Sequence, residues 1–307
     1  MPQFHVKLRD VNVRMHDEEV AVDEGLVRRL INSQLAEWAN LELTVVDPWG
    51  TDNAIWRLGE NFVVRLPRIA WAALQPAFEA EWLSIIAPSL SIAVPEPLAL
   101  GRPEFEYPFQ WSVHRWIPGV PASFENIADP LQFAVDIATV IRQMQGLSLA
   151  SAPPAKNRAR PLREYDSATR NAIAAASHLI NADAALSVWE EALNSPAYDG
   201  APLWVHGDLE GNCLVHGGVL SGLIDWGSAC VGDPAVDIQV VWSPLFSPAS
   251  RQKFFDELKV DSATIARSRG AAVHQACSAL HYYLGTYPDI VKRSWHKLDT
   301  LGIARTS

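Results

Sequence analysis

The chain is poor in cysteine and has no long hydrophobic run. Its 307 residues include three cysteines, Cys213, Cys230 and Cys277, which are too far apart to suggest a metal-binding pair. We therefore expect free, mostly buried thiols in a reducing cytosol. The histidines also lack the spacing of zinc ligands. Because no apolar run approaches the roughly 18 residues of a membrane span, and the polar N-terminus lacks an apolar leader core, we expect a cytoplasmic protein with no membrane partner.

Positive charge is also scarce, which disfavours one class of partner. The sequence has 25 Lys and Arg against 35 Asp and Glu, a formal charge of −10, whereas nucleic acid selects basic surfaces. We therefore expect no nucleic-acid partner. The same charge is compatible with a cationic small molecule, although acidic surfaces also serve solubility alone. A serine hydrolase is disfavoured as well, because no serine lies in a Gly-x-Ser-x-Gly elbow.

What the sequence does have is the composition of a globular enzyme. Hydrophobic residues make up 49% of the chain and charged residues 20%, which is ordinary for a protein with its own core. The length allows one large domain or two moderate ones. The composition alone does not choose a reaction.

The segment WVHGDLEGN, residues 204–212, contains the strongest candidates for catalytic and metal-binding residues. Asp208 and Asn212 lie on a turn between short apolar runs, and a His-Gly-Gly-Val hairpin signal at 216–219 precedes another run that ends at Asp225. Carboxylate and amide oxygens are hard ligands of the kind that hold Mg²⁺ against nucleotide phosphates. In such a site Asp208 would orient a substrate hydroxyl or receive its proton, and Asn212 and Asp225 would hold the metal. The segment therefore predicts phosphoryl transfer.

Three motifs in this order resemble the aminoglycoside phosphotransferase family, bacterial small-molecule kinases related to the protein-kinase fold. They are HGD with a following Asn at 206–212, IDWG at 224–227, and GDP with a following Asp at 232–237. The resemblance extends over about residues 18–301 and is specific from 204 to 237. It implies an α+β, bilobal protein-kinase-like fold, with a small antiparallel β-sheet N-lobe that carries a helix and a larger, mostly helical C-lobe.

The resemblance also implies the roles of residues near the catalytic loop. Asp208 would be catalytic, Asn212 and Asp225 would bind Mg²⁺, and His206 and Asp237 would support the loop from beneath. ATP or GTP would be the phosphoryl donor. The sequence departs from the family in one respect: Asp208 and Asn212 are four steps apart instead of five, so Asn212 suits a metal only if the loop tightens around Gly211.

The N-terminal part predicts a nucleotide-covering sheet. A helix begins after Asp23, and strands at 41–46, 54–58 and 61–66 follow. A turn at Gly50 and Thr51 would cover phosphates with backbone N–H groups.

In the kinase fold a lysine on the third strand contacts the nucleotide phosphates and pairs with a helix glutamate. By resemblance Arg65 takes the lysine position, and Glu81, with Glu79 as the alternative, supplies the carboxylate. Arg115, Trp116 and Ile117 would form the hinge that reads the nucleobase. We place the N-lobe at 1–117 and the C-lobe at 118–307.

The C-terminal part predicts helices over 129–144, 161–180, 183–193, 250–258, 261–284 and 288–301. In related proteins, helices inserted here help to line the acceptor pocket. The acidic side chains that could face a cationic acceptor, or equally solvent, are Glu164, Asp166, Asp183, Glu190 and Glu191.

These features predict a kinase that phosphorylates a hydroxyl of a small molecule, most simply an aminoglycoside, which would make it an antibiotic-resistance enzyme. A macrolide kinase, a metabolic alcohol kinase of the same fold, and a nucleotide-binding pseudokinase remain open. We expect a monomer or homodimer. The first residues, which suggest a short strand before Met15, would be an upstream extension if Met15 is the start used in the cell.

Overall fold

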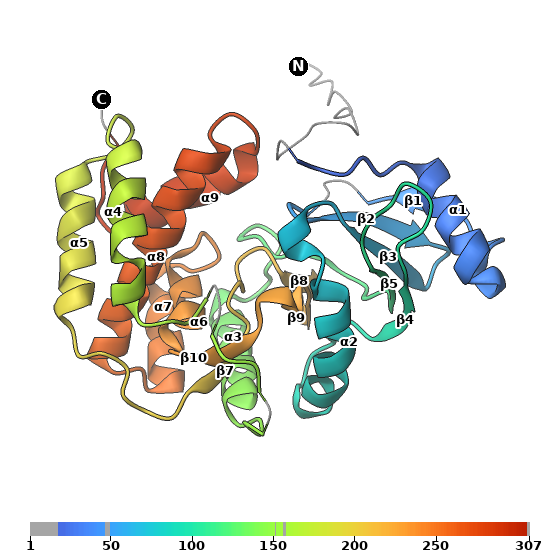
Figure 1. Ribbon diagram of the computed structural model, residues 1–307. Coiled ribbons are helices and arrows are strands. Elements are labelled where there is room, and N and C mark those ends of the chain that lie inside the picture. Colours follow the sequence, from blue (N-terminus) through green and yellow to red (C-terminus); the bar gives the residue numbers. More distant parts are fainter. Residues whose placement is uncertain (1–17, 47–49, 151, 156–157, 306–307) are drawn as a thin grey trace, which may run out of the picture. The chain divides into compact units, whose positions relative to one another are not determined.

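The computed structural model describes residues 18–46, 50–150, 152–155 and 158–305 (Figure 1). The strand expected within residues 1–14 and the question of Met15 lie outside these ranges. The chain divides into two compact units, Met1–Ala77 with Leu98–His114, and Phe78–Pro97 with Arg115–Ser307. This differs from the predicted division after residue 117. The helical residues from Phe78 onward belong to the second unit because Trp82, Leu83 and Ile86 are part of its core.

The first unit is built on a five-stranded sheet with strand order β1-β2-β3-β5-β4. β1 pairs antiparallel with β2, and β2 with β3 around a turn at Gly59, whose φ of +56° suits glycine. The strands predicted at 54–58 and 61–66 therefore pair as a hairpin. The strands are β1 (Leu43–Val45), β2 (Asn53–Leu58), β3 (Phe62–Pro67), β4 (Pro97–Gly101) and β5 (Trp111–Arg115).

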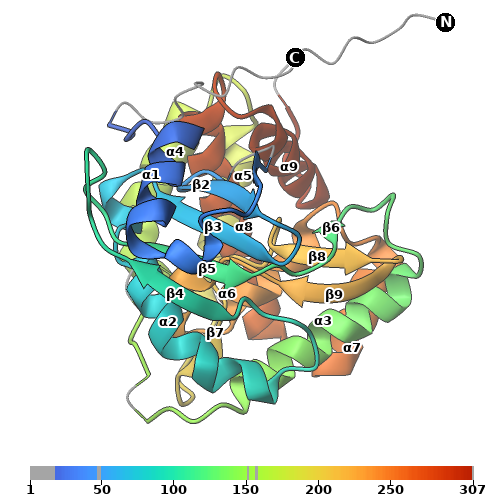
Figure 2. The same cartoon turned by 90° about the vertical axis from the view of Figure 1, so that its right-hand side faces the viewer.

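One helix packs on this sheet. α1 (Glu24–Gln34) begins at Asp23, whose carboxylate accepts a hydrogen bond from the Leu26 N–H at 2.7 Å, as the sequence predicts for an N-cap. Its apolar stripe is buried together with residues of β1, β2, β3 and β5. Figure 2 shows α1 lying across β2 and β3. The stripe consists of Leu26, Val27, Leu30 and Ile31.

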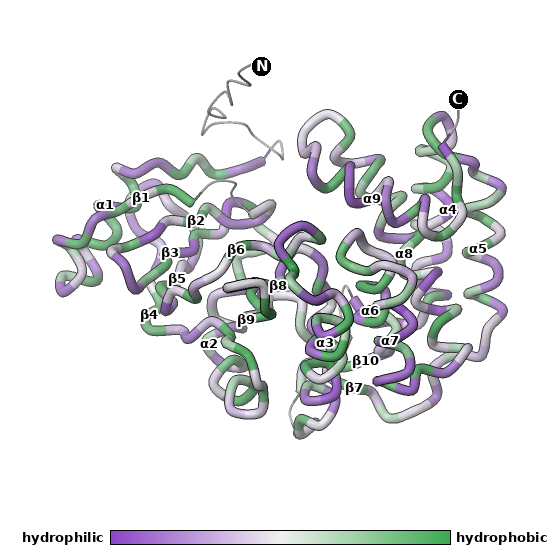
Figure 3. Tube along the Cα trace, turned by 180° about the vertical axis from the view of Figure 1, so that it is seen from behind, coloured by the Kyte–Doolittle hydropathy of each residue, from purple (hydrophilic) through white to green (hydrophobic). Residues whose placement is uncertain are grey.

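The second unit is mostly helical. Its helices are α2 (Gln75–Ile86, from Phe78), α3 (Pro130–Gln145), α4 (Asp166–Ala175), α5 (Ala182–Asn194), α6 (Ala235–Ile238), α7 (Pro248–Leu258), α8 (Ser262–Tyr283) and α9 (Pro288–Thr300). Its short strands are β6 (Val120–Pro121), β7 (Leu203–Val205), β8 (Cys213–His216), β9 (Val219–Leu223) and β10 (Cys230–Gly232). In Figure 3 hydrophobic and hydrophilic residues alternate along these helices, as expected where one face is buried.

Local signals explain most helix ends, and two starts differ from the sequence prediction. Asp129 and Asp261 cap α3 and α8 with their side chains, as expected. α5 is capped by Asn181, two residues before the predicted Asp183. The helix predicted from Pro161 to 180 is instead a 3₁₀ turn, Leu162–Tyr165, followed by α4.

Each of the eight helices named above contributes residues to the core of the second unit, and α6 contributes Ile238. Cys213, Cys230 and Cys277 are free and buried, as predicted. Among the described residues, no helix is both long and apolar enough to span a membrane.

Candidate active site

Two short antiparallel pairings position the predicted catalytic loop within the second unit. β7, which leads into the loop, pairs with β10, and β8, which leaves the loop, pairs with β9. The β8–β9 turn is Gly217 and Gly218, both at positive φ, as the hairpin signal predicts. The loop is thus fixed at both ends, and β9 delivers Asp225 beside it.

Asp237 holds the first half of the loop. Its Oδ2 accepts the His206 N–H and its Oδ1 accepts the Gly207 N–H, both at 2.8 Å. The side chain is buried, and burial raises the pKa of Asp237 to about 7, against the lowering effect of these two hydrogen bonds. Asp237 thus bonds the backbone of the loop at two positions; its role as a support of catalysis stays a prediction.

His206 is a structural link rather than a proton carrier. Its Nε2 donates to Ile224 O at 3.0 Å, and its Nδ1 accepts the Asp208 N–H at 3.2 Å. The imidazole is fully buried and packs edge-on against Trp226, with ring centroids 4.8 Å apart. Burial lowers the pKa of His206, so the neutral ring ties Asp208 to the segment that carries Asp225.

The shortened loop turns at Gly211. This glycine has a φ of +88°, a conformation that side chains disfavour. The turn lets Asn212 Nδ2 donate to Asp208 O at 2.7 Å, while Ile224 N donates to Asn212 O at 3.0 Å. The four-step spacing therefore closes into an ordered loop. Asn212 therefore lies directly beside Ile224, the residue before Asp225.

Asp225 has an unusual backbone conformation. Its φ of 61° and ψ of 68° lie in the left-handed region, which costs a non-glycine residue about 1 kcal/mol or more. The next residue, Trp226, donates its N–H at 3.0 Å to Oε1 of Glu79 on α2. Such strain gathers at functional sites, where neighbouring contacts hold it in place.

The donor set fits a magnesium ion shared with a nucleotide. Because Asn212 Nδ2 is engaged with the backbone, its Oδ1 is the group left for a cation, and Asp225 adds a carboxylate. Mg²⁺ commonly takes one or two protein oxygens and completes its shell with water and phosphate. The described part of the chain contains no cluster of three His, Cys, Asp or Glu that could hold a metal.

Three residues beside Asp208 were not identified from the sequence. Gln275 on α8 donates its Nε2 to Asp208 Oδ1 at 3.3 Å. The ammonium of Lys297 on α9 contacts Gln275 Oε1 and lies 2.5 Å from Glu210 Oε2. Lys297 is 2% exposed. Only the packing of α8 and α9 beside the loop brings these groups together, so no local motif could have indicated them.

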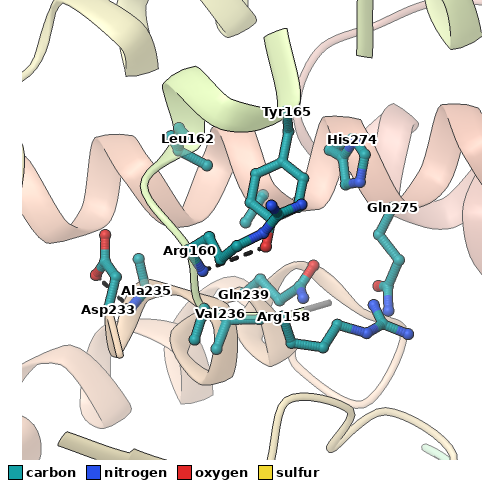
Figure 4. Close-up of a pocket in the computed structure, with 12 residues that line it drawn as sticks. Arg158, Arg160, Leu162, Tyr165, Asp233, Ala235, Val236, Gln239, His274 and Gln275 are labelled. Atoms are coloured by element: carbon teal, nitrogen blue, oxygen red, sulfur yellow. Dashed lines mark hydrogen bonds between the residues drawn. The ribbon is translucent and has the colours of Figure 1, made fainter. Parts of the chain in front are cut away.

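Two cavities open beside the loop. One of about 50 Å³ is lined by Arg158, Tyr165, Gln239, His274 and Gln275, among others (Figure 4). A larger cavity of about 740 Å³ is bordered by the loop residues Glu210 and Gly211 and by side chains of α7 and α9. The larger cavity borders the loop directly, and the smaller one is linked to Asp208 through the Gln275 amide.

The predicted nucleotide residues of the first unit are placed as follows. Arg65 is 9% exposed, on β3 opposite Ile55 in an inner position of the sheet, and is not a surface residue of an edge strand. Gly50 is exposed and Thr51 half-buried, and they follow residues 47–49, which the structure does not describe. Their contact with phosphates stays a prediction.

The glutamate prediction on α2 needs a correction. Glu81 is exposed to solvent, whereas Glu79, the alternative, is 1% exposed and bonded to the Trp226 backbone. A solvated carboxylate is poorly suited to a fixed ion pair. Glu79 is therefore the α2 glutamate that fits the site, and its pairing with Arg65 stays a prediction.

In the predicted hinge, residues 115–117, Arg115 is already bonded to another residue of the protein. The Arg115 N–H donates to Glu96 O at 3.0 Å, and the Arg115 guanidinium is 2.5 Å from a Glu96 carboxylate oxygen. That N–H is therefore not free for a nucleobase. Trp116 and Ile117 are half-buried, and their role stays a prediction.

The acidic side chains considered for a cationic acceptor are mostly paired. Four of the five lie within ion-pair distance of arginines, which occupy their charge. Asp183 is exposed in the first turn of α5. The pairs are Glu164 with Arg160, Asp166 and Glu190 with Arg170, and Glu191 with Arg269.

The fold and this loop together define a phosphotransferase. A model of the phosphotransferase enzyme family matches residues 44–272. The chain therefore belongs to this family. No curated protein sequence matches the chain.

Solved structures share the fold at low identity. The GDP complex of an aminoglycoside 2′-phosphotransferase is 15% identical with a TM-score of 0.72, covering 91% of this chain and 97% of its own. The GDP and kanamycin complex of APH(2″)-IIIa is 16% identical, with a TM-score of 0.72 and coverage of 90% and 98%. A macrolide 2′-phosphotransferase from Brachybacterium faecium is 21% identical, with a TM-score of 0.58 and coverage of 91% and 97%. The α+β, kinase-like fold is thereby confirmed.

Proposed function

We propose that this chain is a kinase that transfers the γ-phosphoryl group of ATP or GTP to a hydroxyl of a small molecule. The observation that carries the proposal is the loop geometry: Asp208 lies on a loop braced by Asp237, and one backbone hydrogen bond sets Asn212 beside the strand that delivers Asp225. This is the constellation that phosphoryl transfer requires.

Each residue of the site has a separate role in the proposed reaction. Gln275 and the His206 ring orient Asp208, whose carboxylate holds the acceptor hydroxyl and accepts its proton as the oxygen attacks. The bond from this oxygen to the γ-phosphorus forms while the bond to the β-phosphate oxygen breaks, and the nucleoside diphosphate leaves. Asn212 and Asp225 would hold Mg²⁺, which when bound neutralises charge on the transferred group.

The acceptor class is open between several candidates. Structures of similar fold include aminoglycoside phosphotransferases in complex with kanamycin and with gentamicin, and a macrolide 2′-phosphotransferase. An aminoglycoside acceptor, suggested by the charge of −10, stays a prediction, as do a macrolide and a metabolic alcohol. A pseudokinase is suggested by the single glycine of the N-terminal turn, by Arg65 in place of lysine and by the four-step loop. The ordered turn at Gly211 weakens the last of these three arguments.

Release of ADP or GDP tests the proposal. Purified protein would be assayed with Mg²⁺ and ATP or GTP against aminoglycosides, macrolides, neutral alcohols and hydroxy acids. We expect acceptor-stimulated release that falls by about two to four orders of magnitude in Asp208→Asn, as for loss of a general base. Equal turnover in Asp208→Asn would contradict the assignment, and nucleotide binding without release on any acceptor would favour a pseudokinase.

A further inference from the structure

The small cavity beside Asp208, here called the Arg158 cavity, is part of the catalytic neighbourhood. Gln275 lines it and donates to Asp208 Oδ1. Arg158 lines it from the other side, and a Cβ added at Gly207 would lie 3.3 Å from the Arg158 Cβ and Cγ. Figure 4 shows the Arg158 side chain running toward the Gln275 amide. A group bound here would lie next to an acceptor hydroxyl at Asp208.

The charges of the cavity are positive. Arg158 has no ion-pair partner among the residues that the structure describes. Arg160 adds a second guanidinium, which lies over the Tyr165 ring and pairs with Glu164. An unpaired, half-buried guanidinium is well suited to a planar oxyanion, which it can bind in a bidentate way.

No carboxylate in the described lining of the cavity is free for a cation. The acidic residue there is Asp233, which is 8% exposed. Its Oδ2 accepts from Arg267 Nε at 2.8 Å, and its Oδ1 accepts the Ala235 N–H at 3.0 Å. An ammonium group placed here would meet Arg158 without a compensating negative charge, which is unfavourable.

Buried polar atoms in the cavity also lack partners. Gln239 is 6% exposed. Within the part of the chain that the structure describes, its Oε1 accepts no hydrogen bond, and the buried Arg160 Nε donates none. Figure 4 shows the Gln239 amide turned toward the cavity. Unpaired buried polar groups are costly, so an occupant that supplies a donor to Gln239 and an acceptor to arginine would stabilise the site.

His274 contributes no charge to this site near neutral pH. Its Nδ1 lies 2.8 Å from the Thr169 Oγ1. Burial, together with the positive charge of Arg158, lowers the pKa of His274 to about 4. Among the described residues that line the cavity, the charge left unbalanced is therefore that of Arg158.

We infer that the Arg158 cavity binds an anionic oxyacid group, a carboxylate or a phosphate, of the acceptor. The inference rests on the proposed kinase function and refines its substrate class: the acceptor is an alcohol that carries a negative charge and an adjacent hydrogen-bond donor. A cavity of about 50 Å³ suits one such group rather than a whole sugar. An aminoglycoside, with several ammonium groups, lacks the matching charge.

Acceptor sets of matched skeleton and different charge test the inference. Gluconate, glucose 6-phosphate, glucose and glucosamine form one set, and glycerate, glycerol phosphate, glycerol and serinol form another. We expect kcat/KM to be highest for an anionic member, and the carboxylate and phosphate members to reveal which oxyanion is preferred. A wild-type preference for the amines would overturn the inference.

Variants of Arg158 test whether this side chain binds the anionic group of the acceptor or only supports the folded structure. We expect Arg158→Gln to raise KM for the anionic acceptor by about 10- to 100-fold, the range that hydrogen bonds to a charged group provide, and to reduce the ratio of anionic to neutral kcat/KM. Arg158→Glu should shift preference toward the amine. Arg305→Gln, which removes an exposed arginine paired with Asp299, is the control for charge alone. If Arg158→Gln raised KM for the nucleotide instead, Arg158 would serve the donor and the inference would fall.

A binding measurement keeps this inference distinct from the kinase proposal. Calorimetric titration of gluconate and glycerate into wild type and Arg158→Gln needs no turnover. Binding to wild type that is lost in Arg158→Gln would support the anionic site even if no acceptor were phosphorylated. Absence of binding of every anionic probe to wild type would overturn it even if another alcohol proved to be a substrate.

Discussion

At the scale of single residues, the site depends on groups that are costly to bury. Lys297 is a buried cation whose charge is balanced by Glu210, and through Gln275 it fixes the carboxylate of Asp208. Asp225 keeps a strained backbone conformation beside Asn212. Buried charges and strained backbones gather at functional sites, so both support the proposal that this loop is the active site.

The buried ion pair predicts a specific pattern of stability. Lys297→Met should lower the free energy of unfolding by about 3 kcal/mol or more, because Glu210 is left buried and unpaired. It should also lower kcat with little change in nucleotide KM, since Gln275 loses its anchor. The double variant Lys297→Met/Glu210→Gln should regain much of the stability in urea unfolding, but not the turnover. A double variant as unstable as the single one would show that the charge is not the cause.

The strain at Asp225 can be measured directly. Asp225→Gly should be more stable than Asp225→Ala by about 1 kcal/mol, because only glycine adopts a φ of 61° without penalty. In an ordinary helical or extended position the order would be reversed. Thermal or urea unfolding of the two variants measures this difference, and a more stable Asp225→Ala would contradict the strain. Both variants should lack turnover.

At the scale of elements, the catalytic loop combines predictable and unpredictable parts. The hairpin after it, the cap of α8 at Asp261 and the order of the three motifs could be read from the sequence because turn and cap residues act locally. The loop contacts from α8 and α9 could not, since Gln275 and Lys297 lie more than sixty residues away and have no motif of their own. The choice between Glu79 and Glu81 was likewise beyond local sequence signals, because the burial of each side chain depends on which elements pack on α2.

The turn at Gly211 predicts an activity loss larger than its stability loss. Gly211→Ala places a Cβ at a φ of +88° and 2.2 Å from the Arg293 Nη1, which must move. The strain should cost about 1–2 kcal/mol, while displacement of Asn212 should lower kcat by about tenfold or more.

Gly302→Ala is the matched control for this substitution. Gly302 has a φ of +79° and nothing within 4 Å of an added Cβ. It should lose similar stability and keep full kcat. Equal kcat in the two variants would mean that the turn at Gly211 does not position the metal ligand.

At the scale of the whole molecule, the α+β class followed from the resemblance of the three motifs to a known family, and the similar solved structures confirm it. The apolar patterns by themselves indicated individual strands and helices. The division between the units was less predictable: it falls after His114, not after Ile117, and α2 contributes to the second core. Which unit a helix joins depends on tertiary packing. The net charge, also a whole-molecule property, suggested a cationic acceptor, whereas the local lining of the Arg158 cavity is positive.

Acid should destabilise the fold through its buried histidines. Burial and the nearby charge of Arg65 lower the pKa of His114 to about 3. Because the unfolded chain takes up this proton near its ordinary pKa, stability is complete above about pH 6.5 and falls as the pH drops toward 3, with a loss of about 2 kcal/mol at about pH 5. Urea unfolding at about pH 7.5 and about pH 5 measures this loss.

The variant His114→Gln isolates the contribution of this histidine. The gap in free energy of unfolding between wild type and variant should narrow by about 2 kcal/mol from about pH 7.5 to about pH 5. The raised pKa of Asp237 acts with the opposite sign, lowering stability as the pH rises through about 7, but it is common to both proteins and cancels. Parallel pH curves would contradict the assignment to His114.

The most direct test of the central claim is transfer of a labelled γ-phosphoryl group from ATP or GTP, with Mg²⁺, to an acceptor alcohol, followed by isolation of the product. The account predicts a labelled phosphate ester of the acceptor with wild type, and a rate lower by about two to four orders of magnitude with Asp208→Asn. Label that appears only as inorganic phosphate, or equal labelling by the two proteins, would contradict the claim that this loop phosphorylates a small-molecule hydroxyl.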